Sequence, residues 1–230
     1  MHITVLTLFP EIFPGPLGVS LLGRALENKI WSLKTVSLKD YGIGHHKTVD
    51  DACYSGGAGM VIRPDIIDSA LVDATCCVDD FTCVYMTPRG SLMKDAMLKT
   101  YATPGHNIIV LCGRYEGVDQ RVLEHWNFQE ICLGDFVLCG GDIPAMAFIE
   151  GCVRYLPGVV GNAQSVASES FCHGLLEHPQ YTRPKIWKEK GVPEVLTSGH
   201  HAKIAQWKKV LSEQHTKKIR PDLWSKYKNH

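Results

Sequence analysis

Residues 108–117 read Ile-Ile-Val-Leu-Cys-Gly-Arg-Tyr-Glu-Gly, and residues 129–142 read Gln-Glu-Ile-Cys-Leu-Gly-Asp-Phe-Val-Leu-Cys-Gly-Gly-Asp. Each stretch contains a short apolar run typical of a buried strand, followed at once by glycine. Glycine after a strand lets a ligand approach the backbone closely, and ligands of open α/β sheets bind at the carboxyl ends of strands. Gly113 and Gly134 are therefore expected to face one crevice, unless these glycines only make tight turns.

Segments typical of strands and helices alternate outward from these two stretches. Apolar runs or alternation predict strands at residues 2–9, 31–38, 82–86, 108–112, 129–133 and 136–139. Helical spacing predicts helices at residues 19–30, 64–74, 92–101 (capped by Ser91), 117–126 and 142–155. Residues 41–60 are expected to be a long Gly-rich loop. The alternation predicts an α/β domain with a mainly parallel sheet.

This domain is expected to end near Pro157, so that residues 1–157 form one domain. Residues 158–179 are rich in Gly, Ser, Ala and Asn without a firm period, which is typical of a functional lid or a flexible linker. Residues 180–230 are expected to form a small helical domain, with helices at residues 201–214 and 221–227.

Charge is unevenly distributed along a chain whose formal net charge is zero. Residues 181–230 hold 12 Lys/Arg and 4 Asp/Glu, a net of +8, and residues 1–180 hold 12 Lys/Arg and 20 Asp/Glu, a net of −8. A basic tail on an acidic body indicates a polyanionic partner such as nucleic acid, or else a solvated lysine-rich helical surface.

Cysteine spacing and hydropathy indicate the cellular compartment of the protein. The nine cysteines include no Cys-x-x-Cys pair, so neither a disulfide framework nor a zinc site is expected. No apolar run approaches the ~20 residues of a membrane span, and the N-terminus is a poor signal peptide. We expect a cytoplasmic protein with no membrane contact.

The Gly-x-Gly-x-x-Gly and P-loop motifs are both absent, which argues against a dinucleotide-dependent oxidoreductase.

Further strings make a family resemblance specific. They are His-Lys-Thr-Val-Asp-Asp at residues 46–51, the glycine-rich residues 54–60, the segment 165–171, Tyr-Thr-Arg-Pro at 181–184 and Ser-Gly-His-His-Ala at 198–202. With the two opening stretches, they resemble the bacterial tRNA (guanine-37-N1)-methyltransferases of the SPOUT superfamily. The resemblance runs from Leu6 to about Trp207.

The resemblance implies a SPOUT-type α/β fold, with a parallel sheet, a deep C-terminal trefoil knot in the first domain, and a small α-helical C-terminal domain. It implies S-adenosyl-L-methionine as the cofactor and a homodimer whose active sites lie across the interface. The implied substrate is the tRNA guanosine just 3′ of the anticodon. A divalent ion such as Mg²⁺ is implied as an aid, although the sequence shows no dedicated metal site.

Site residues follow from the resemblance position by position. The implied cofactor-binding residues are Pro88, Gly113, Tyr115, Glu116, Gly117, Leu133, Gly134, Asp135, Phe136, Val137, Leu138, Gly140, Gly141 and Pro144. Peptide groups can read adenine edges while apolar side chains cover the ring, although Leu133 and Leu138 are equally typical of core packing. The implied RNA-binding residues are Lys47, Asp50, Tyr54, Gly57, Gly59, Met60, Lys203, Lys208 and Lys209.

Guanine N1 carries a proton and is a poor nucleophile, so its methylation needs one base and one cation near O6. The resemblance implies Arg154 as the cation, although a helix-end salt bridge would also explain this residue. The family has Asp-Ser-Phe where this chain has Glu169-Ser170-Phe171. Glu169 is expected to be the base because it keeps the carboxylate, and the alternatives are a slower enzyme or a base supplied elsewhere.

Two other functions fit the same strings. One is a related SPOUT enzyme that methylates a ribose hydroxyl or ribosomal RNA, which would need no carboxylate at position 169. The other is a tRNA-binding module without catalytic activity.

Overall fold

The computed structural model describes residues 1–54, 56, 59–161 and 169–229. The chain divides into two compact units, Met1–Gly161 and Asn162–His230, and each is considered by itself. Within the described residues, no helix is both long and apolar enough to cross a membrane.

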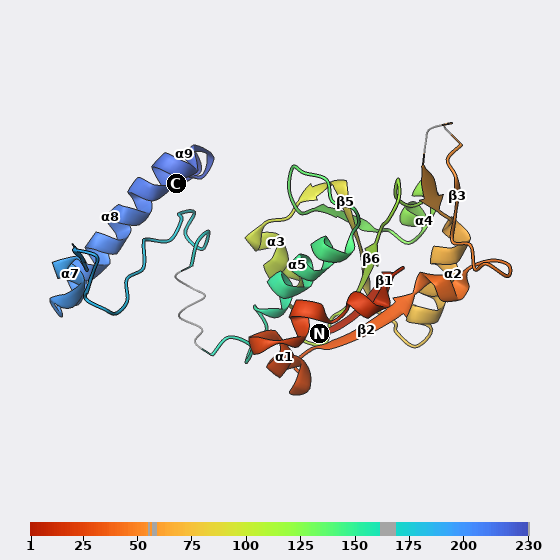
Figure 1. Cartoon of the computed structure of the whole chain (residues 1–230), viewed down its shortest axis with the longest axis horizontal. Coiled ribbons are helices and arrows are strands. Elements are labelled where there is room, and N and C mark those ends of the chain that lie inside the picture. Colours follow the sequence, from red (N-terminus) through yellow and green to blue (C-terminus); the bar gives the residue numbers. More distant parts are fainter. Residues whose placement is uncertain (55, 57–58, 162–168, 230) are drawn as a thin grey trace. The chain divides into compact units, whose positions relative to one another are not determined.

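A five-stranded parallel sheet forms the centre of the first unit (Figure 1). Its strands lie in the order β2 (Ser32–Ser37), β1 (His2–Thr7), β6 (Asn107–Cys112), β5 (Thr82–Leu92) and β7 (Gln129–Cys132). Every neighbouring pair is parallel. The predicted α/β architecture with a parallel sheet is therefore confirmed.

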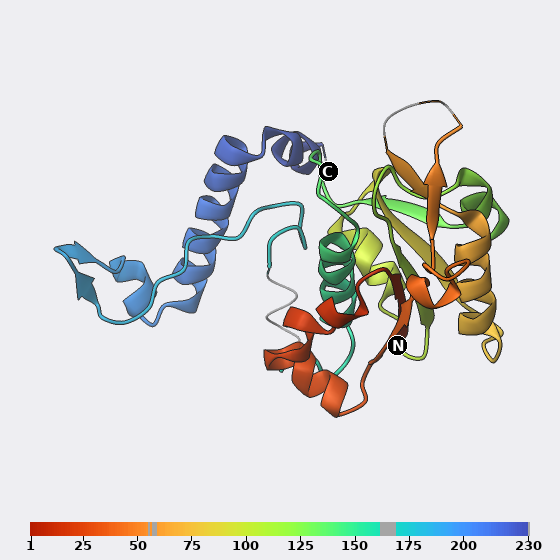
Figure 2. The same cartoon turned by 45° about the vertical axis from the view of Figure 1, so that its right-hand side comes forward.

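Helices cover both faces of this sheet (Figure 2). On one face lie α1 (Ser20–Glu27), α3 (Asp95–Tyr101) and α5 (Asp142–Val153), and on the other lie α2 (Pro64–Thr75) and α4 (Gln120–His125). The sheet has a hydrophobic core on each face, and strand β6 contributes to both. Ile108 and Val110 pack into the core beneath α1, α3 and α5, and Ile109 and Leu111 pack into the core beneath α2 and α4. Successive side chains alternate between faces, so a strand buried on both sides is apolar throughout.

Three 3₁₀ turns complete the first unit, at Pro10–Ile12, Gly15–Gly18 and Leu38–Tyr41. A separate antiparallel pair, β3 (Asp50–Ala52) and β4 (Met60–Ile62), lies beside the main sheet. The prediction of an unbroken loop over residues 41–60 was wrong, because β3 and a bridge between Ile43 and Thr48 interrupt it.

Two other local predictions were also wrong. Residues 136–139 form no strand, because the Phe136 N–H donates to the Gly134 carbonyl at 2.8 Å in a tight turn. Ser91 does not cap a helix. It belongs to β5, where Ser91 pairs with Ile131 and Leu92 with Cys132, so α3 begins only at Asp95. A local turn overrides the pattern at residues 136–139, and pairing with β7 overrides it at Ser91.

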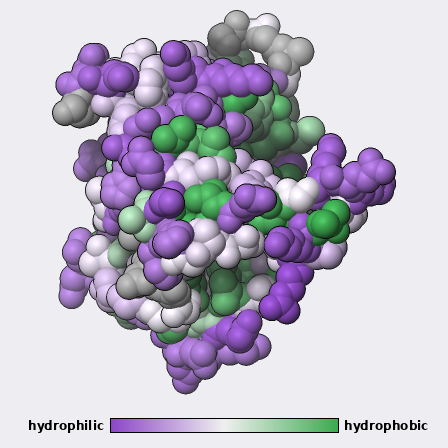
Figure 3. All heavy atoms as spheres, turned by 90° about the vertical axis from the view of Figure 1, so that its left-hand side faces the viewer, coloured by the Kyte–Doolittle hydropathy of each residue, from purple (hydrophilic) through white to green (hydrophobic). Residues whose placement is uncertain are grey.

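The described residues of the second unit, 169–229, include a short hairpin and three helices. Its elements are β8 (Ile186–Trp187), β9 (Lys190–Gly191), α7 (Glu194–Thr197), α8 (His201–Ile219) and α9 (Pro221–Lys228). The Trp207 ring lies 6.3 Å from the His178 ring and 6.1 Å from the Tyr181 ring, which forms a small aromatic cluster on α8. Figure 3 shows a surface that is largely hydrophilic, with hydrophobic side chains between the polar ones.

Candidate functional site

A cavity of about 240 Å³ lies at the carboxyl ends of β6 and β7, beside the middle of β5. Three backbone segments line it, residues 85–88, 113–117 and 132–141 without Asp135, together with Pro144 at the start of α5. This is where ligands bind in open α/β sheets.

The cavity brings together thirteen of the fourteen residues expected to bind a cofactor. Asp135 is the exception, since it is not among the lining residues. The lining also includes residues that sequence reasoning missed: Tyr85, Met86, Thr87, Arg114, Cys132 and Cys139. Each is adjacent in sequence to an expected residue or lies in the β5 segment before Pro88, so strand ends alone would have indicated them.

The buried carboxylate of Asp142 connects the elements around the cavity. Its Oδ1 accepts a hydrogen bond from Thr7 Oγ1 at 2.6 Å, and its Oδ2 accepts two from Arg114, from Nε at 2.9 Å and from Nη2 at 2.6 Å. Asp142 is only 2% exposed, and it occupies the first turn of α5, where a helix favours negative charge.

Arg114 extends this network toward the cavity wall. Its Nη1 donates to the Cys139 carbonyl at 3.4 Å, and its guanidinium lies 4.6 Å from the centroid of the Phe9 ring. The ends of β1 and β6, the start of α5 and the 132–141 loop are thus held by one ion pair.

The 132–141 loop also touches β6 directly through backbone. The Gly141 N–H donates to the Gly113 carbonyl at 2.8 Å. A Cβ at position 141 would lie 2.9 Å from Gly113 N and 3.0 Å from Cys112 Cα, so only glycine permits this approach.

The chemistry of the cavity suits a nucleoside with an apolar and a polar side. Three apolar side chains of the 132–141 loop are exposed instead of packed into the core: Phe136 at 54%, Val137 at 81% and Leu138 at 39%. Backbone N–H and C=O groups of the same loop lie among them, and such groups can read the edges of an adenine. Glu116 supplies a carboxylate that can receive a cationic group. These residues fit a cofactor that combines adenosine with an amino acid.

Backbone hydrogen bonds join the β3–β4 hairpin to the cavity. Glu116 N donates to the Met60 carbonyl at 3.0 Å, and Ile62 N donates to the Gly117 carbonyl at 2.9 Å. Asp50 pairs with Ile62, and Tyr54 beyond it is fully exposed. Lys47 lies further back, with its Nζ 3.7 Å from Asp40 Oδ1. Gly59 precedes β4, and Gly57 lies outside the described residues.

The expected cation, Arg154, does not reach the cavity of its own chain. It is the C-cap of α5, whereas Pro144 in the first turn of that helix lines the cavity. At 1.5 Å per residue, the two backbone positions are about 15 Å apart. The Arg154 guanidinium lies 5.4 Å from the Tyr155 ring centroid, and the Tyr155 hydroxyl donates to Asp95.

The expected base lies in a hydrogen-bonded turn of the second unit. Cys172 N donates to the Glu169 carbonyl at 3.3 Å, and Glu177 N donates to Ser170 Oγ at 3.0 Å. Leu176 N donates to Thr216 Oγ1 at 2.8 Å, which attaches this turn to α8. Thr216 is completely buried, so the turn that contains Glu169 is attached to the interior of its own unit.

The three expected lysines of α8 are exposed but do not share one face. Lys203 and Lys208 are separated by about 140° around the helix at 100° per residue. Lys209 forms an ion pair with Glu213 at 3.9 Å. These lysines therefore surround α8 with positive charge.

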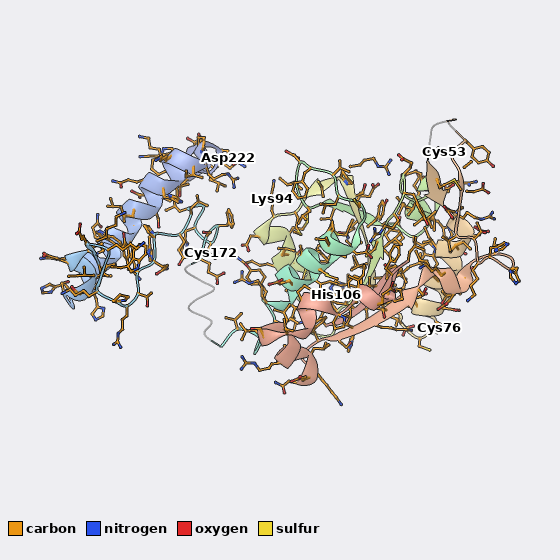
Figure 4. The ribbon with its side chains drawn as sticks, in the orientation of Figure 1. Cys53, Cys76, Lys94, His106, Cys172 and Asp222 are labelled. Carbon is orange, nitrogen blue, oxygen red and sulfur yellow. The ribbon has the colours of Figure 1, made fainter. Side chains whose placement is uncertain are left out.

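Figure 4 labels Cys53, Cys76 and Cys172, which lie outside the helices and strands, whereas Cys83, Cys112, Cys132 and Cys152 lie in β5, β6, β7 and α5. Burial raises the pKa of Cys83 and of Cys152 to about 12. Burial, then Asp142, also raises the pKa of Cys112 well above its usual value. These three thiols stay protonated at neutral pH and act as small apolar side chains.

Fold and site together define an α/β protein with a parallel central sheet and a cavity lined by the segments that follow β6 and β7. The family model of "tRNA (Guanine-1)-methyltransferase TrmD" matches residues 1–226. The chain belongs to this family.

Curated relatives agree over nearly the whole chain. A tRNA (guanine-N(1)-)-methyltransferase of Ruegeria sp. (strain TM1040) is 52% identical over 97% of this chain and 91% of its own length. Proteins of the same name from Rhodospirillum rubrum and Gluconobacter oxydans are 49% and 50% identical, over 99% and 97% of this chain and 94% of their own lengths.

The close approach at Gly141 generates a prediction. Gly141→Ala pushes the 132–141 loop away from β6, so the dissociation constant for S-adenosylmethionine is expected to rise at least tenfold in calorimetry. Gly161→Ala is the matched control, because a Cβ there meets no atom within 4 Å. Equal affinities for the two variants would contradict the role of the Gly141 contact.

Proposed function

We propose that the protein transfers a methyl group from S-adenosyl-L-methionine to N1 of guanosine 37 of tRNA. The observation that carries the proposal is the cavity formed by residues 85–88, 113–117 and 132–141, in a chain whose family and relatives are tRNA (guanine-N1)-methyltransferases. When bound, the cofactor supplies an electrophilic methyl group. The residues that would hold it are the fourteen expected from the sequence, with Asp135 in the loop but outside the lining.

The protein's task at the guanine is to remove a proton and to stabilise charge. Glu169 is proposed to accept the N1 proton, because a carboxylate within hydrogen-bond reach can act as a general base. Arg154 is proposed to donate to O6, where negative charge develops as N1 loses its proton. A charge-assisted hydrogen bond of this kind is worth roughly 1.5–3 kcal/mol when it is desolvated.

The β3–β4 hairpin is proposed to hold the target nucleotide. A base edge can be methylated only outside the stack, so the guanosine has to be extruded into a pocket. Two backbone hydrogen bonds support this role, since they attach the hairpin to the wall of the cavity: Glu116 N donates to the Met60 carbonyl, and Ile62 N donates to the Gly117 carbonyl. Lys47, Asp50, Tyr54, Gly57, Gly59 and Met60 are the proposed contacts.

Residues 180–230 of the second unit are proposed to be a tRNA-binding domain, joined to domain 1–157 by a linker over residues 158–179. Its net charge of +8 over residues 181–230 supports the assignment. Lys203, Lys208 and Lys209 are the proposed phosphate contacts. Phosphate neutralisation by lysine makes affinity depend strongly on salt.

A homodimer is part of the proposal because one chain alone gives an incomplete site. Arg154 lies about 15 Å along α5 from Pro144, so the partner subunit has to bring this cation to the cavity. Large apolar side chains near the cavity are exposed, including Tyr115 at 56%, Val137 at 81% and Ile143 at 63%. Such a surface is typical of an interface.

A trefoil knot at the C-terminal end of the first domain is also proposed. Gly141 passes within hydrogen-bonding distance of Gly113, and a Cβ at Gly90 would lie 2.4 Å from the backbone of β7. The first contact brings the 132–141 loop against the segment that follows β6, which supports the proposal; the second lies at the irregularity where β5 pairs with β7.

The proposed reaction takes place in the cytoplasm and includes Mg²⁺ as an aid. Within the described residues, no group of three or more His, Cys, Asp or Glu side chains is arranged to hold a metal ion. The proposal therefore includes no metal held by a dedicated protein site.

The experiment is methyl transfer from labelled S-adenosylmethionine to two transcripts of one tRNA, with G or A at position 37. We expect label on the G transcript only, recovered as N1-methylguanosine. Glu169→Gln should lower the single-turnover rate by about 10²–10⁴, the usual contribution of a general base. A change of less than about threefold would remove Glu169 from the mechanism.

The same assay separates the alternative functions. Equal labelling of both transcripts would indicate a ribose methyltransferase. Cofactor binding without label on either transcript would indicate a tRNA-binding module without activity.

The proposed dimer predicts a solution mass of twice the chain mass of 25.6 kDa. Light scattering at micromolar concentration checks this directly. Val137→Glu should shift the mass toward the monomer, because a charge would enter an apolar interface. A wild-type mass of 25.6 kDa would contradict the composite site.

A further inference from the structure

The hairpin β8–β9 in the second unit has a register that its turn defines. Ile186 pairs with Gly191 and Trp187 with Lys190, and Val192 N donates to the Lys185 carbonyl at 2.9 Å. The two turn residues, Lys188 and Glu189, have φ values of 46° and 64°. Two successive left-handed residues form the turn type that matches the twist of a two-residue hairpin.

This register decides which side chains share a face. Alternate residues of a strand point to the same side, and directly paired residues of two strands do too. Lys185, Trp187 and Lys190 therefore lie on one face, and Ile186 lies on the other. The Lys188 ammonium is 5.0 Å from the centroid of the Trp187 ring. Three lysines thus surround one indole.

The hairpin is almost entirely accessible. All residues from 181 to 191 are exposed, and the Trp187 and Ile186 side chains are 61% and 67% exposed. A two-stranded hairpin is only marginally stable in water by itself. An exposed indole on such an element is typical of a contact site for a partner.

The charge around Trp187 indicates which partner fits. A protein surface would have to bury three ammonium groups, and lysine is depleted in the cores of protein–protein interfaces. Unpaired nucleic acid fits both the lysines and the exposed indole, because lysines contact its phosphates and an aromatic ring stacks on its bases. The only acidic residue in the hairpin is Glu189, at the tip of the turn.

We propose that the β8–β9 hairpin is an RNA-contact element, in which Trp187 stacks on an unpaired base of the tRNA and Lys185, Lys188 and Lys190 contact the neighbouring phosphates. This inference rests on the proposed tRNA substrate and adds a base-stacking residue to it. The hairpin belongs to a different unit from the β3–β4 hairpin, so the two make separate contacts with the RNA.

The test is the dissociation constant for the unmodified G37 transcript, measured by fluorescence anisotropy at fixed salt for the full-length protein. Trp187→Ala should raise it about 5- to 100-fold, because stacking on one base is worth that much. Trp187→Phe should stay within about threefold of wild type. Ile186→Ser is the matched control, since it removes an equally exposed apolar side chain from the opposite face and should leave the constant unchanged.

The salt dependence of RNA binding by lysine variants is a second test. Lys190→Ala should reduce the slope of log affinity against log salt by about 1, as expected for the loss of one phosphate contact. Binding of S-adenosylmethionine, measured by calorimetry, should be unchanged in every hairpin variant.

Three results would overturn the inference: tRNA binding by Trp187→Ala as tight as wild type, an equal loss in Ile186→Ser, or a shift of Trp187→Ala to a smaller solution mass. The second would indicate that the apolar hairpin packs against protein, and the third that it covers a second copy of the chain. Failure of wild-type protein to methylate either transcript would instead overturn the proposed function.

Discussion

The ion pair between Asp142 and Arg114 is the interaction on which the first unit most depends. A carboxylate that is 2% exposed receives three hydrogen bonds, one from the end of β1 and two from the residue that follows Gly113. Removal of one partner from a buried pair typically costs about 3–5 kcal/mol, because the other charge is left without compensation. No described side chain has a buried nitrogen or oxygen atom without a hydrogen-bond partner.

The cavity follows from this constraint. With Arg114 held, its Nη1 fixes the Cys139 carbonyl, and Gly141 bonds to Gly113. The 132–141 loop therefore keeps its apolar side chains exposed around a set of backbone donors and acceptors, instead of collapsing onto the core. Arg154 lies at the other end of α5 from Pro144, so the proposed composite site rests on the proposed dimer.

Sequence patterns predicted the sheet and, through Gly113 and Gly134, the place of the cavity, because both depend on local signals; most of the other lining residues were expected only from the family resemblance. Apolar runs such as residues 108–112 mark strands buried on both faces, and the glycines after them mark the strand ends. The strand expected at residues 136–139 was wrong because the chain turns at Gly134, where the Phe136 N–H donates to the Gly134 carbonyl. Arg114 follows Gly113 directly, so its place at the cavity was predictable, but its ion pair with Asp142, 28 residues away, was not, because no periodicity encodes that contact.

The most direct test of this account is the affinity of Asp142→Asn for S-adenosylmethionine, measured by calorimetry on protein whose folding is checked by circular dichroism. Asparagine keeps the shape of the side chain but removes the charge that holds Arg114. We expect a dissociation constant at least tenfold above wild type, with the loop released from β6. An unchanged affinity would contradict the claim that this ion pair organises the cavity.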